Sequence, residues 1–423
     1  MPDSRPQMPE TRLLVLSSLF PHRGAPMTGL FVRERMFRVG HELPITVVSP
    51  RPWFPGQGLL RRFKPNYRPP APAHERQAEF DVHFPRFLAL PGIGRRFDSL
   101  MMALASWRCL RQLGATDAFD VIDAHFGYPD GHAATLLGRW LQRPVSITLR
   151  GTEPGHAGVT SLRRRLTQGL MAATRVFAVS DSLRRVAIEL GVPEQKTRVV
   201  GNGVSLEVFR REDQAAARAR LGLPHAAPVL VSVGGLVERK GFHRVIELLP
   251  QLRERHPGLR YLVVGGPSPE GDWGPRLRDQ VSQLGLEECV VFCGPRPPAE
   301  LRWLLSAADV FVLATSNEGW ANVFLEAMAC GLPVVTTDVG GNTEVVCREE
   351  LGVVVPFGDA RLLRAAIERA LSTPWNRERI MAYANENAWE TRVRVLVDEF
   401  RRIAAIKRPT TDQRQSNTTE HRA

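Results

Sequence analysis

The sequence predicts an α/β protein built from two doubly wound, Rossmann-like parallel-sheet domains. Short apolar segments of strand length alternate with helix-length segments along most of the 423 residues. The strand-length segments are apolar throughout, which is typical of parallel sheets covered by helices on both faces. The alternation restarts after Asn202-Gly203, and a single core rarely serves a chain of this length. We therefore expect two domains that face each other across a cleft.

The N-terminal domain is expected to span residues 1–200. Helical segments between its apolar strands predict parallel pairing. Residues 50–95 interrupt the pattern, because they are rich in proline, arginine and aromatic residues and show little periodicity. We expect an irregular insertion there. The strands of this domain are expected at 13–18, 45–49, 119–124, 145–148, 175–179 and 198–200, and helices at 31–39, 97–113, 131–141 and 182–190.

A second domain is expected over residues 228–385, after a linker at 201–227 that contains a polar helix near 214–221. A closing helix follows over residues 386–406. The tail, residues 407–423, is polar and has no periodic apolar face, so we expect it to be disordered. Open α/β sheets bind ligands at the carboxyl ends of their strands. The second set of strands is expected at 229–233, 261–264, 290–292, 310–313, 334–336 and 353–355, with a further helix at 360–371.

The net charge of +12 is distributed unevenly along the chain. Residues 1–200 contain 28 basic and 16 acidic side chains, whereas residues 201–423 contain 28 of each. A basic half suggests contact with an anionic surface, either nucleic acid or membrane. The second half is neutral and the sequence has no recognised nucleic-acid-binding motif, so we expect no nucleic-acid partner. A solvated basic face is an equally good interpretation.

Cysteine usage and hydropathy indicate a cytoplasmic protein. The five cysteines are odd in number and scattered through apolar segments, which favours a reducing compartment. Cys289 and Cys293 flank a strand without further ligands at zinc spacing, so we expect buried thiols and no metal site. No apolar run approaches the roughly 20 residues of a membrane span. The apolar residues 13–16 soon meet Pro21, His22 and Arg23, which argues against a signal peptide.

A glycine-rich turn at residues 234–241 carries two basic side chains. It follows a predicted strand and precedes a predicted helix. The N–H groups and the helix dipole at such a turn attract an anion. Arg239 and Lys240 add two positive charges, which suits a diphosphate better than a single carboxylate. A plain loop with exposed basic residues is the alternative, and the basic pair favours phosphate binding.

Residues 317–333 contain two glutamates at a predicted loop-to-helix junction. Glu318 is expected on the loop, and Glu326 about one turn into a helix that begins near Asn322. Both carboxylates can face one ligand that lies across the helix N-terminus. Carboxylates suit the hydroxyl groups of a sugar, as in dinucleotide-binding folds. The alternative is two exposed acids that the helix dipole favours.

This segment, NEGWANVFLEAMACGLP, resembles the retaining glycosyltransferases of family 4, which have the GT-B fold. The first half carries a weaker resemblance in LFPHRGAPMTGLFVRE, DAHFGYPDG and TLRGTE. The chain is similar to bacterial enzymes that build envelope and exported polysaccharides, including the teichuronic-acid type. The resemblance extends through GNGVS at 201–205, SVGGLVERKG at 232–241, VVGGP at 263–267, VFCGPRP at 291–297 and GG at 340–341.

The resemblance implies a nucleotide-sugar donor and a role for individual residues. Arg239 and Lys240 match the pair that holds the donor diphosphate, Glu318 the glutamate beside the donor sugar, and Glu326 the one on the ribose. His125 matches a histidine that lines the cleft near the reacting carbon. The implied catalytic residues are thus Glu318, Lys240, Arg239 and His125. Further donor contacts are implied for Gly29, Gly234, Gly235, Gly266, Arg296, Asn322 and Val323, and Arg150 and Asn202 are candidates for the acceptor side.

The first half also departs from the family pattern. Residues 150–153 read Arg-Gly-Thr-Glu, where the family commonly has His or Tyr, then Gly, Ser or Thr, and Asp. We expect Arg150 to meet a phosphate or an acidic sugar, or to pair with Glu153. His125 has a second interpretation, because a histidine after a strand is often a structural hydrogen-bonding group. Asp130 is expected to cap the helix that follows it.

The resemblance further implies metal independence, and the sequence has no Asp-x-Asp motif. No cofactor is expected, because the nucleotide-sugar is a substrate. Another GT-B enzyme, such as an epimerase or a phosphorylase, and a non-catalytic basic binding protein are the alternatives. The domain expected to receive the acceptor, a saccharide or a lipid-linked saccharide, carries the whole basic excess. Peripheral docking on the anionic inner face of the cytoplasmic membrane is suggested by basic clusters at 61–64, 95–97 and 163–165.

Overall fold

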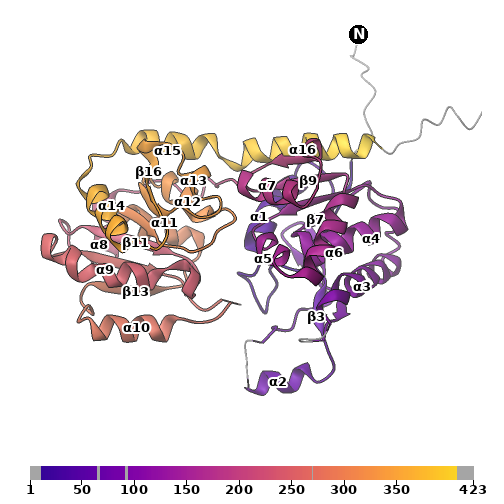
Figure 1. Cartoon of the computed structure of the whole chain (residues 1–423), viewed down its shortest axis with the longest axis horizontal. Coiled ribbons are helices and arrows are strands. Elements are labelled where there is room, and N and C mark those ends of the chain that lie inside the picture. The colour runs from indigo at the N-terminus through magenta and orange to yellow at the C-terminus, as the bar shows by residue number, and fades with distance from the viewer. Residues whose placement is uncertain (1–10, 64–66, 91–93, 269, 407–423) are drawn as a thin grey trace, which may run out of the picture. The chain divides into compact units, whose positions relative to one another are not determined.

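The structure, a computed structural model of the chain, describes residues 11–63, 67–90, 94–268 and 270–406. The chain forms two compact units (Figure 1). Of the described residues, the first unit contains those from 11 to 200, except 180–182, and those from 393 to 406. The second contains residues 180–182 and 201–392. The predicted disordered tail lies outside the described residues.

An eight-stranded sheet forms the centre of the first unit, in the order β10-β9-β8-β7-β1-β2-β5-β4. Neighbouring strands are parallel except β4 and β5. The predicted strands are present, with ends that differ by up to two residues. The strands are β1 (Leu13–Leu16), β2 (Ile45–Val48), β4 (His74–Gln77), β5 (Phe80–His83), β7 (Val121–His125), β8 (Val145–Leu149), β9 (Arg175–Ala178) and β10 (Thr197–Val199), and the helices are α1 (Leu30–Gly40), α3 (Asp98–Gln112), α4 (His132–Leu141), α5 (Glu153–Ala157), α6 (Thr160–Ala172) and α7 (Asp181–Glu189).

Residues 50–95 are more regular than the insertion that the sequence suggested. β3 (Arg51–Trp53) pairs in parallel with β6 (Arg86–Leu88) as a separate two-stranded sheet. β4 and β5 extend the main sheet at its edge, and α2 (Gln57–Phe63) follows β3 in the chain. These strands have three or four residues, and β4 is polar throughout. An edge strand tolerates that polarity, which leaves no apolar run to recognise.

The C-terminal helix α16 (Trp389–Ala405) begins in the second unit and from Val393 belongs to the first. Its Phe400 packs edge-to-face against Phe177 of β9, with the ring centroids 6.0 Å apart. Buried Glu399 forms ion pairs with Arg175, at 2.8 Å, and with Arg198. The last helix therefore completes the core of the N-terminal sheet. Among the described residues, no helix is both long and apolar enough to cross a membrane.

The second unit contains a six-stranded parallel sheet, in the order β13-β12-β11-β14-β15-β16. Residues 201–227, expected to form a linker, belong to this unit, where their helix α8 packs against α11. The strands are β11 (Val229–Val233), β12 (Arg260–Val264), β13 (Val290–Gly294), β14 (Val310–Leu313), β15 (Val334–Thr337) and β16 (Gly352–Val355), and the helices are α8 (Gln214–Arg220), α9 (Phe242–Arg255), α10 (Gly274–Gln283), α11 (Pro298–Ala307), α12 (Asn322–Ala329), α13 (Asn342–Val345), α14 (Ala360–Ser372) and α15 (Arg377–Glu386).

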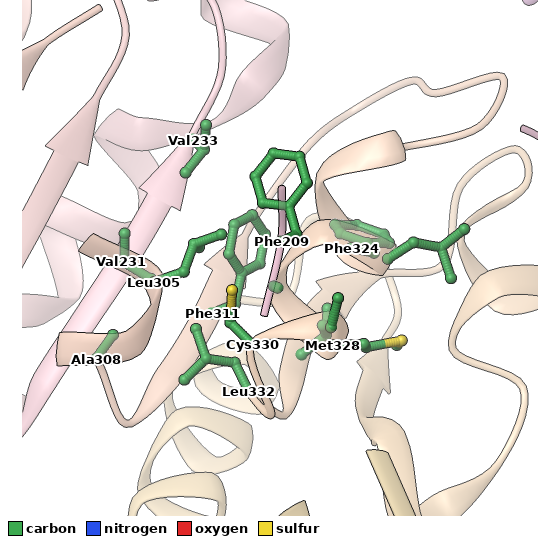
Figure 2. Packing of buried hydrophobic residues seen from close by; sticks show 14 of the residues in the cluster. Phe209, Val231, Val233, Leu305, Ala308, Phe311, Phe324, Met328, Cys330 and Leu332 are labelled. Carbon is green, nitrogen blue, oxygen red and sulfur yellow. The ribbon is translucent and has the colours of Figure 1, made fainter. Parts of the chain in front are cut away.

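Aromatic packing positions helix α12 on this sheet. Phe324 of α12 and Phe311 of β14 are fully buried, with ring centroids 5.8 Å apart, inside the apolar cluster of Figure 2. Burying a phenyl ring contributes roughly 2–3 kcal/mol, so this contact fixes the helix on the strand. The loop between β14 and α12 is therefore held at both ends.

The order of the strands predicts where this unit binds a ligand. The chain runs from β11 outward through β12 and β13, then returns to β14 on the other side of β11. The connections thus reverse direction between β11 and β14. Ligands of doubly wound sheets bind at such a switch point, beyond the carboxyl ends of the strands.

Candidate active site

Three charged side chains meet where the loops after β11 and β14 approach each other. Nζ of Lys240 lies 2.5 Å from Oε1 of Glu318, and Nη1 of Arg239 lies 3.2 Å from the same oxygen. The backbones of the two loops are joined by the N–H of Ser316, which donates to the carbonyl of Arg239 at 2.8 Å. The side chains of Lys240 and Glu318 are only 14 % and 8 % exposed, so solvent screens this ion pair weakly. The structure brings these predicted residues together.

A fourth charged residue, Glu270, completes the group. Its carboxylate accepts hydrogen bonds from Nε and Nη2 of Arg239, each at 2.7 Å, in a bidentate pair. These bonds raise the pKa of Arg239 and lower the pKa of Glu270. The charges of the two cations and the two carboxylates therefore balance. Glu270 was not predicted, because it lies in an irregular loop after β12 and outside the motif at 263–267.

The loop that carries Glu318 is pressed against the loop after β15. Gly340 has a φ of 53°, in the left-handed region, and a Cβ added there would lie 1.7 Å from the carbonyl oxygen of Glu318. The N–H of Gly341 donates to the same carbonyl at 3.3 Å. The hydroxyl of Thr315 donates to Oε1 of Glu318 at 3.3 Å. The glycine pair therefore fixes the backbone of Glu318, while Thr315 orients its carboxylate.

Helix α12 begins at Asn322, as predicted, one turn before Glu326. It has no side-chain cap and no acidic residue in its first turn, so its dipole favours an anion at this end. Nδ2 of Asn202 donates to Oδ1 of Asn322 at 2.8 Å, which joins the segment at 201–205 to the start of the helix. Val323 and Glu326 are half-buried on the same helix. Asn202, a candidate for the acceptor side, thus contacts a predicted donor residue in the second unit.

The other predicted donor residues of this unit lie on the loops after β11, β12 and β13. The N–H of Leu236 donates to the carbonyl of Gly266 at 2.8 Å, which joins the Gly234-Gly235 turn to the loop after β12. Arg296, after β13, donates to the carbonyl of Cys293 and pairs with Glu300 at 3.1 Å. Its side chain also lines a cavity of about 390 Å³ whose walls come from β13, α8 and α11.

In the first unit, Gly29 ends the loop that leads from β1 into α1. Its φ of 70° and a hypothetical Cβ only 2.3 Å from the carbonyl oxygen of Leu19 require glycine. Asp130 holds the start of this loop, since its carboxylate accepts from the N–H and the hydroxyl of Ser18. The prediction that Asp130 caps α4 was wrong, because adjacent pairing of β1 and β7 brings Ser18 to it. Burial raises the pKa of Asp130 to about 7.

His125, at the end of β7, is completely buried. Its Nδ1 accepts from Nε and Nη2 of Arg150, at 3.1 and 2.9 Å. A guanidinium only donates, so the ring proton is on Nε2, which lies 3.3 Å from Oδ2 of Asp123. Burial, with the charge of Arg150, lowers the pKa of His125 to about 4. The imidazole is therefore neutral at physiological pH, and its catalytic role stays a prediction.

Glu153 closes the turn after β8. Its buried carboxylate accepts from the backbone N–H groups of Arg150, Gly151 and Gly127, at 3.2, 2.8 and 3.0 Å. The guanidinium of Arg150 bonds to His125 and lies over the ring of Phe31, 5.1 Å from its centroid. The carboxylate thus shapes the loop that aims Arg150 at His125.

Two doubly wound units, with basic and acidic side chains at the switch point of the second, define a protein of the GT-B class. Comparisons with known proteins identify the family. Residues 213–387 match the glycosyl transferases group 1, and residues 35–208 match Glycosyltransferase Family 4. The chain belongs to the glycosyltransferases that combine these two domains.

Individual proteins support this assignment. A D-inositol 3-phosphate glycosyltransferase of Corynebacterium urealyticum is 31 % identical over 309 residues, which cover 68 % of this chain and 73 % of that protein. TuaC of Bacillus subtilis, whose name describes a teichuronic acid biosynthesis glycosyltransferase, is 28 % identical over 391 residues. The match covers 90 % of this chain and 91 % of TuaC. The structure of Anabaena HepE in complex with UDP-glucose has a TM-score of 0.69 at 21 % identity, and the match covers 92 % and 99 % of the two chains.

Proposed function

We propose that the protein is a retaining glycosyltransferase that acts in the synthesis of envelope or exported polysaccharides. It moves a sugar from a nucleotide-sugar donor to a saccharide or a lipid-linked saccharide. The observation that carries the donor assignment is the contact of Arg239 and Lys240 with Glu318 at the switch point of the second unit.

The two cations suit the leaving group of this reaction. Negative charge increases on the diphosphate as the bond to the sugar breaks, and fixed positive groups stabilise that charge. Glu318 and Glu270 hold Lys240 and Arg239 in place, so little reorganisation is needed when the diphosphate replaces a carboxylate. The N-terminus of α12 adds its dipole. No metal is needed in this scheme, which predicts full activity in excess EDTA.

We infer attack on the same face of the sugar that the diphosphate leaves. The bond from the anomeric carbon to the diphosphate oxygen breaks, and the acceptor oxygen bonds to that carbon. The acceptor proton passes to the departing phosphate oxygen. In this scheme Glu318 contacts the donor sugar and Glu326 the ribose, roles that the family resemblance supports. His125, with its neutral ring, is proposed to face the reacting carbon after a change in its buried surroundings.

The names of the relatives support the donor class and leave the acceptor broad. HepE is described in complex with UDP-glucose, whereas the other two names refer to inositol 3-phosphate and teichuronic acid. We therefore propose a nucleotide-sugar donor and assign the acceptor to the basic first unit. Peripheral association with the inner face of the cytoplasmic membrane belongs to this proposal.

Nucleotide release from a panel of UDP-, GDP- and ADP-sugars, with and without lipid-linked acceptor, tests the function. A glycosyltransferase releases the nucleotide in step with acceptor glycosylation, and NMR of the product reports retention. An epimerase converts the donor sugar without acceptor, and a phosphorylase forms a sugar phosphate. Stabilisation by a nucleotide-sugar without turnover of any would contradict the enzymatic assignment.

A further inference from the structure

We propose that β3, α2, β6 and the exposed face of α3 form a membrane-docking surface for an anionic bilayer. The role inferred for this surface rests on the proposed function, since the surface would hold the enzyme beside a lipid-linked acceptor. Its binding to lipid is a separate physical property and is measured without any sugar.

Large apolar side chains are exposed mainly in the first unit. On helix α2, Leu59 and Phe63 are 59 % and 80 % exposed, and Leu60 is exposed between them. Isolated exposed apolar residues are ordinary, but a run of them on one short helix indicates an interaction surface. Only four of the exposed large apolar side chains in the described residues belong to the second unit: Leu284, Val291, Phe357 and Leu362.

Large apolar side chains are also exposed on three further elements of the first unit. Trp53 of β3 and Leu88 of β6 are partners in the two-stranded sheet, and both are exposed. β6 packs against α3. Leu100 and Leu104, spaced by one turn on α3, are also exposed, as is Phe97 just before this helix. Three adjacent elements therefore present large apolar side chains to solvent.

The segments that carry these apolar side chains also contain many basic residues and very few acidic ones. Residues 51–72 contain five basic and no acidic residues, and residues 84–116 contain five basic residues and one acid, Asp98. Arg108 follows Leu104 by one turn of α3. The guanidinium of Arg96 lies 4.8 Å from the centroid of the Phe97 ring. Charge complementarity therefore favours a surface of lipid phosphates.

The combination favours a bilayer over nucleic acid. Nucleic acid would engage the arginines through its phosphates but would leave the leucines in water. A bilayer accepts both, because aromatic and leucine side chains enter the headgroup boundary while arginines meet anionic headgroups.

Two arginines of the surface are engaged in hydrogen bonds within the first unit. Arg51 of β3 donates to the carbonyl of Ser18, at 3.0 Å, and to that of Phe20. Arg61 of α2 donates to the carbonyl of Arg68 at 2.8 Å. These arginines support the surface, so its charge is best tested at others.

Flotation of the full chain with vesicles tests the proposal. We expect binding to vesicles of phosphatidylglycerol and phosphatidylcholine at low salt, release at high salt, and no binding to phosphatidylcholine alone. R62Q/R108Q should lower the partition coefficient about 30-fold, because each basic side chain near an anionic surface contributes about fivefold. L60S/F63S should lower it by at least about tenfold. The controls R361Q/R369Q and F357S/L362S on exposed sites of the second unit should stay within about twofold of wild type.

Absence of wild-type binding to the anionic vesicles, or equal binding by the surface variants and the controls, would overturn the proposal. Circular dichroism and thermal unfolding establish that each variant is folded. Stabilisation by nucleotide-sugars, measured in the absence of lipid, should be the same in all variants. A failure of the proposed donor function would appear only in that second measurement, and a failure of docking only in the first.

Discussion

One oxygen of Glu318 contacts both cations of the candidate donor site, Lys240 at 2.5 Å and Arg239 at 3.2 Å. The carboxylate therefore keeps both cations in place, and we propose that a phosphate oxygen of the donor would contact the same two cations. We expect an anion that binds here to exchange with the carboxylate of Glu318. This exchange separates the effects expected of changes at Lys240 and at Glu318.

Replacement of Lys240 by glutamine should lower kcat at least about 100-fold, because a preorganised charge on the leaving group is lost. Stabilisation by the nucleoside diphosphate should fall as well. Rates of nucleotide release and thermal shifts with the diphosphate measure the two effects. Lys196→Gln, a change on the first unit, is the matched control. Activity of K240Q within tenfold of the control would contradict the assignment.

Replacement of Glu318 by glutamine should have the opposite effect on nucleotide binding. The variant leaves Lys240 without its carboxylate, so the free nucleoside diphosphate should bind as tightly as to wild type or more tightly. Transfer should still fall about 100-fold or more, because a contact to the donor sugar is lost. Calorimetry of diphosphate binding and the transfer rate give the two values. A parallel loss of affinity and rate would show that Glu318 does not compete with the phosphate.

Replacement of Gly340 by alanine tests how the Glu318 loop is positioned. The new Cβ would clash with the carbonyl oxygen of Glu318, so the free energy of unfolding should fall by about 3 kcal/mol or more. Sugar transfer should also be lost. Gly285→Ala is a matched control, because Gly285 also has a positive φ, 63°, but nothing within 4 Å of its Cβ. Gly285→Ala should lower the free energy of unfolding by only about 1–2 kcal/mol. Urea unfolding distinguishes the two, and equal losses would refute the role of close approach.

The contribution of Asp130 to the free energy of unfolding of the first unit should decrease as the pH rises. Its pKa is about 7 in the folded chain and 3.8 in the ordinary carboxyl, so the folded state favours the protonated form. This contribution is complete below pH 3.8 and is lost as the pH rises through 7, up to about 4 kcal/mol. Asp130→Asn keeps groups that can bond to Ser18 and removes the titration. Relative to wild type, the variant should gain stability between these pH values.

The contribution of His125 to the free energy of unfolding should change with pH in the opposite direction to that of Asp130. Its pKa falls from 6.5 to about 4 on folding, so its contribution is complete above pH 6.5 and is lost as the pH falls toward 4. The limit is about 3 kcal/mol. The two buried groups offset each other in the wild type, so each variant is compared with wild type at every pH. His225→Gln, on an exposed side chain, is the control for His125→Gln. A difference between His125→Gln and wild type that does not change with pH would contradict the buried neutral imidazole.

Most regular elements were accessible from the sequence, because strands buried on both faces form continuous apolar runs. The strands at Val229–Val233 and Val310–Leu313 have the predicted ends. Strands β3 to β6 were missed because they have only three or four residues each, and the edge strand β4 has no apolar face. Asp130 was assigned to the wrong partner, because helix caps are local whereas Ser18 reaches it through strand pairing over 112 residues.

The sequence by itself predicted the fold class and three of the charged residues of the candidate donor site, because glycine turns, apolar runs and a loop-to-helix junction are local patterns. Only the tertiary structure decided which groups these residues contact. It paired Arg239 with Glu270, enclosed His125 between Asp123 and Arg150, and set Gly340 against Glu318. Such contacts join loops that are far apart in the chain, and their geometry depends on which strands lie side by side. The sequence shows the excess of basic residues in the first half of the chain. Only the folded structure shows that some of these arginines lie near exposed apolar side chains, on the proposed membrane-docking surface.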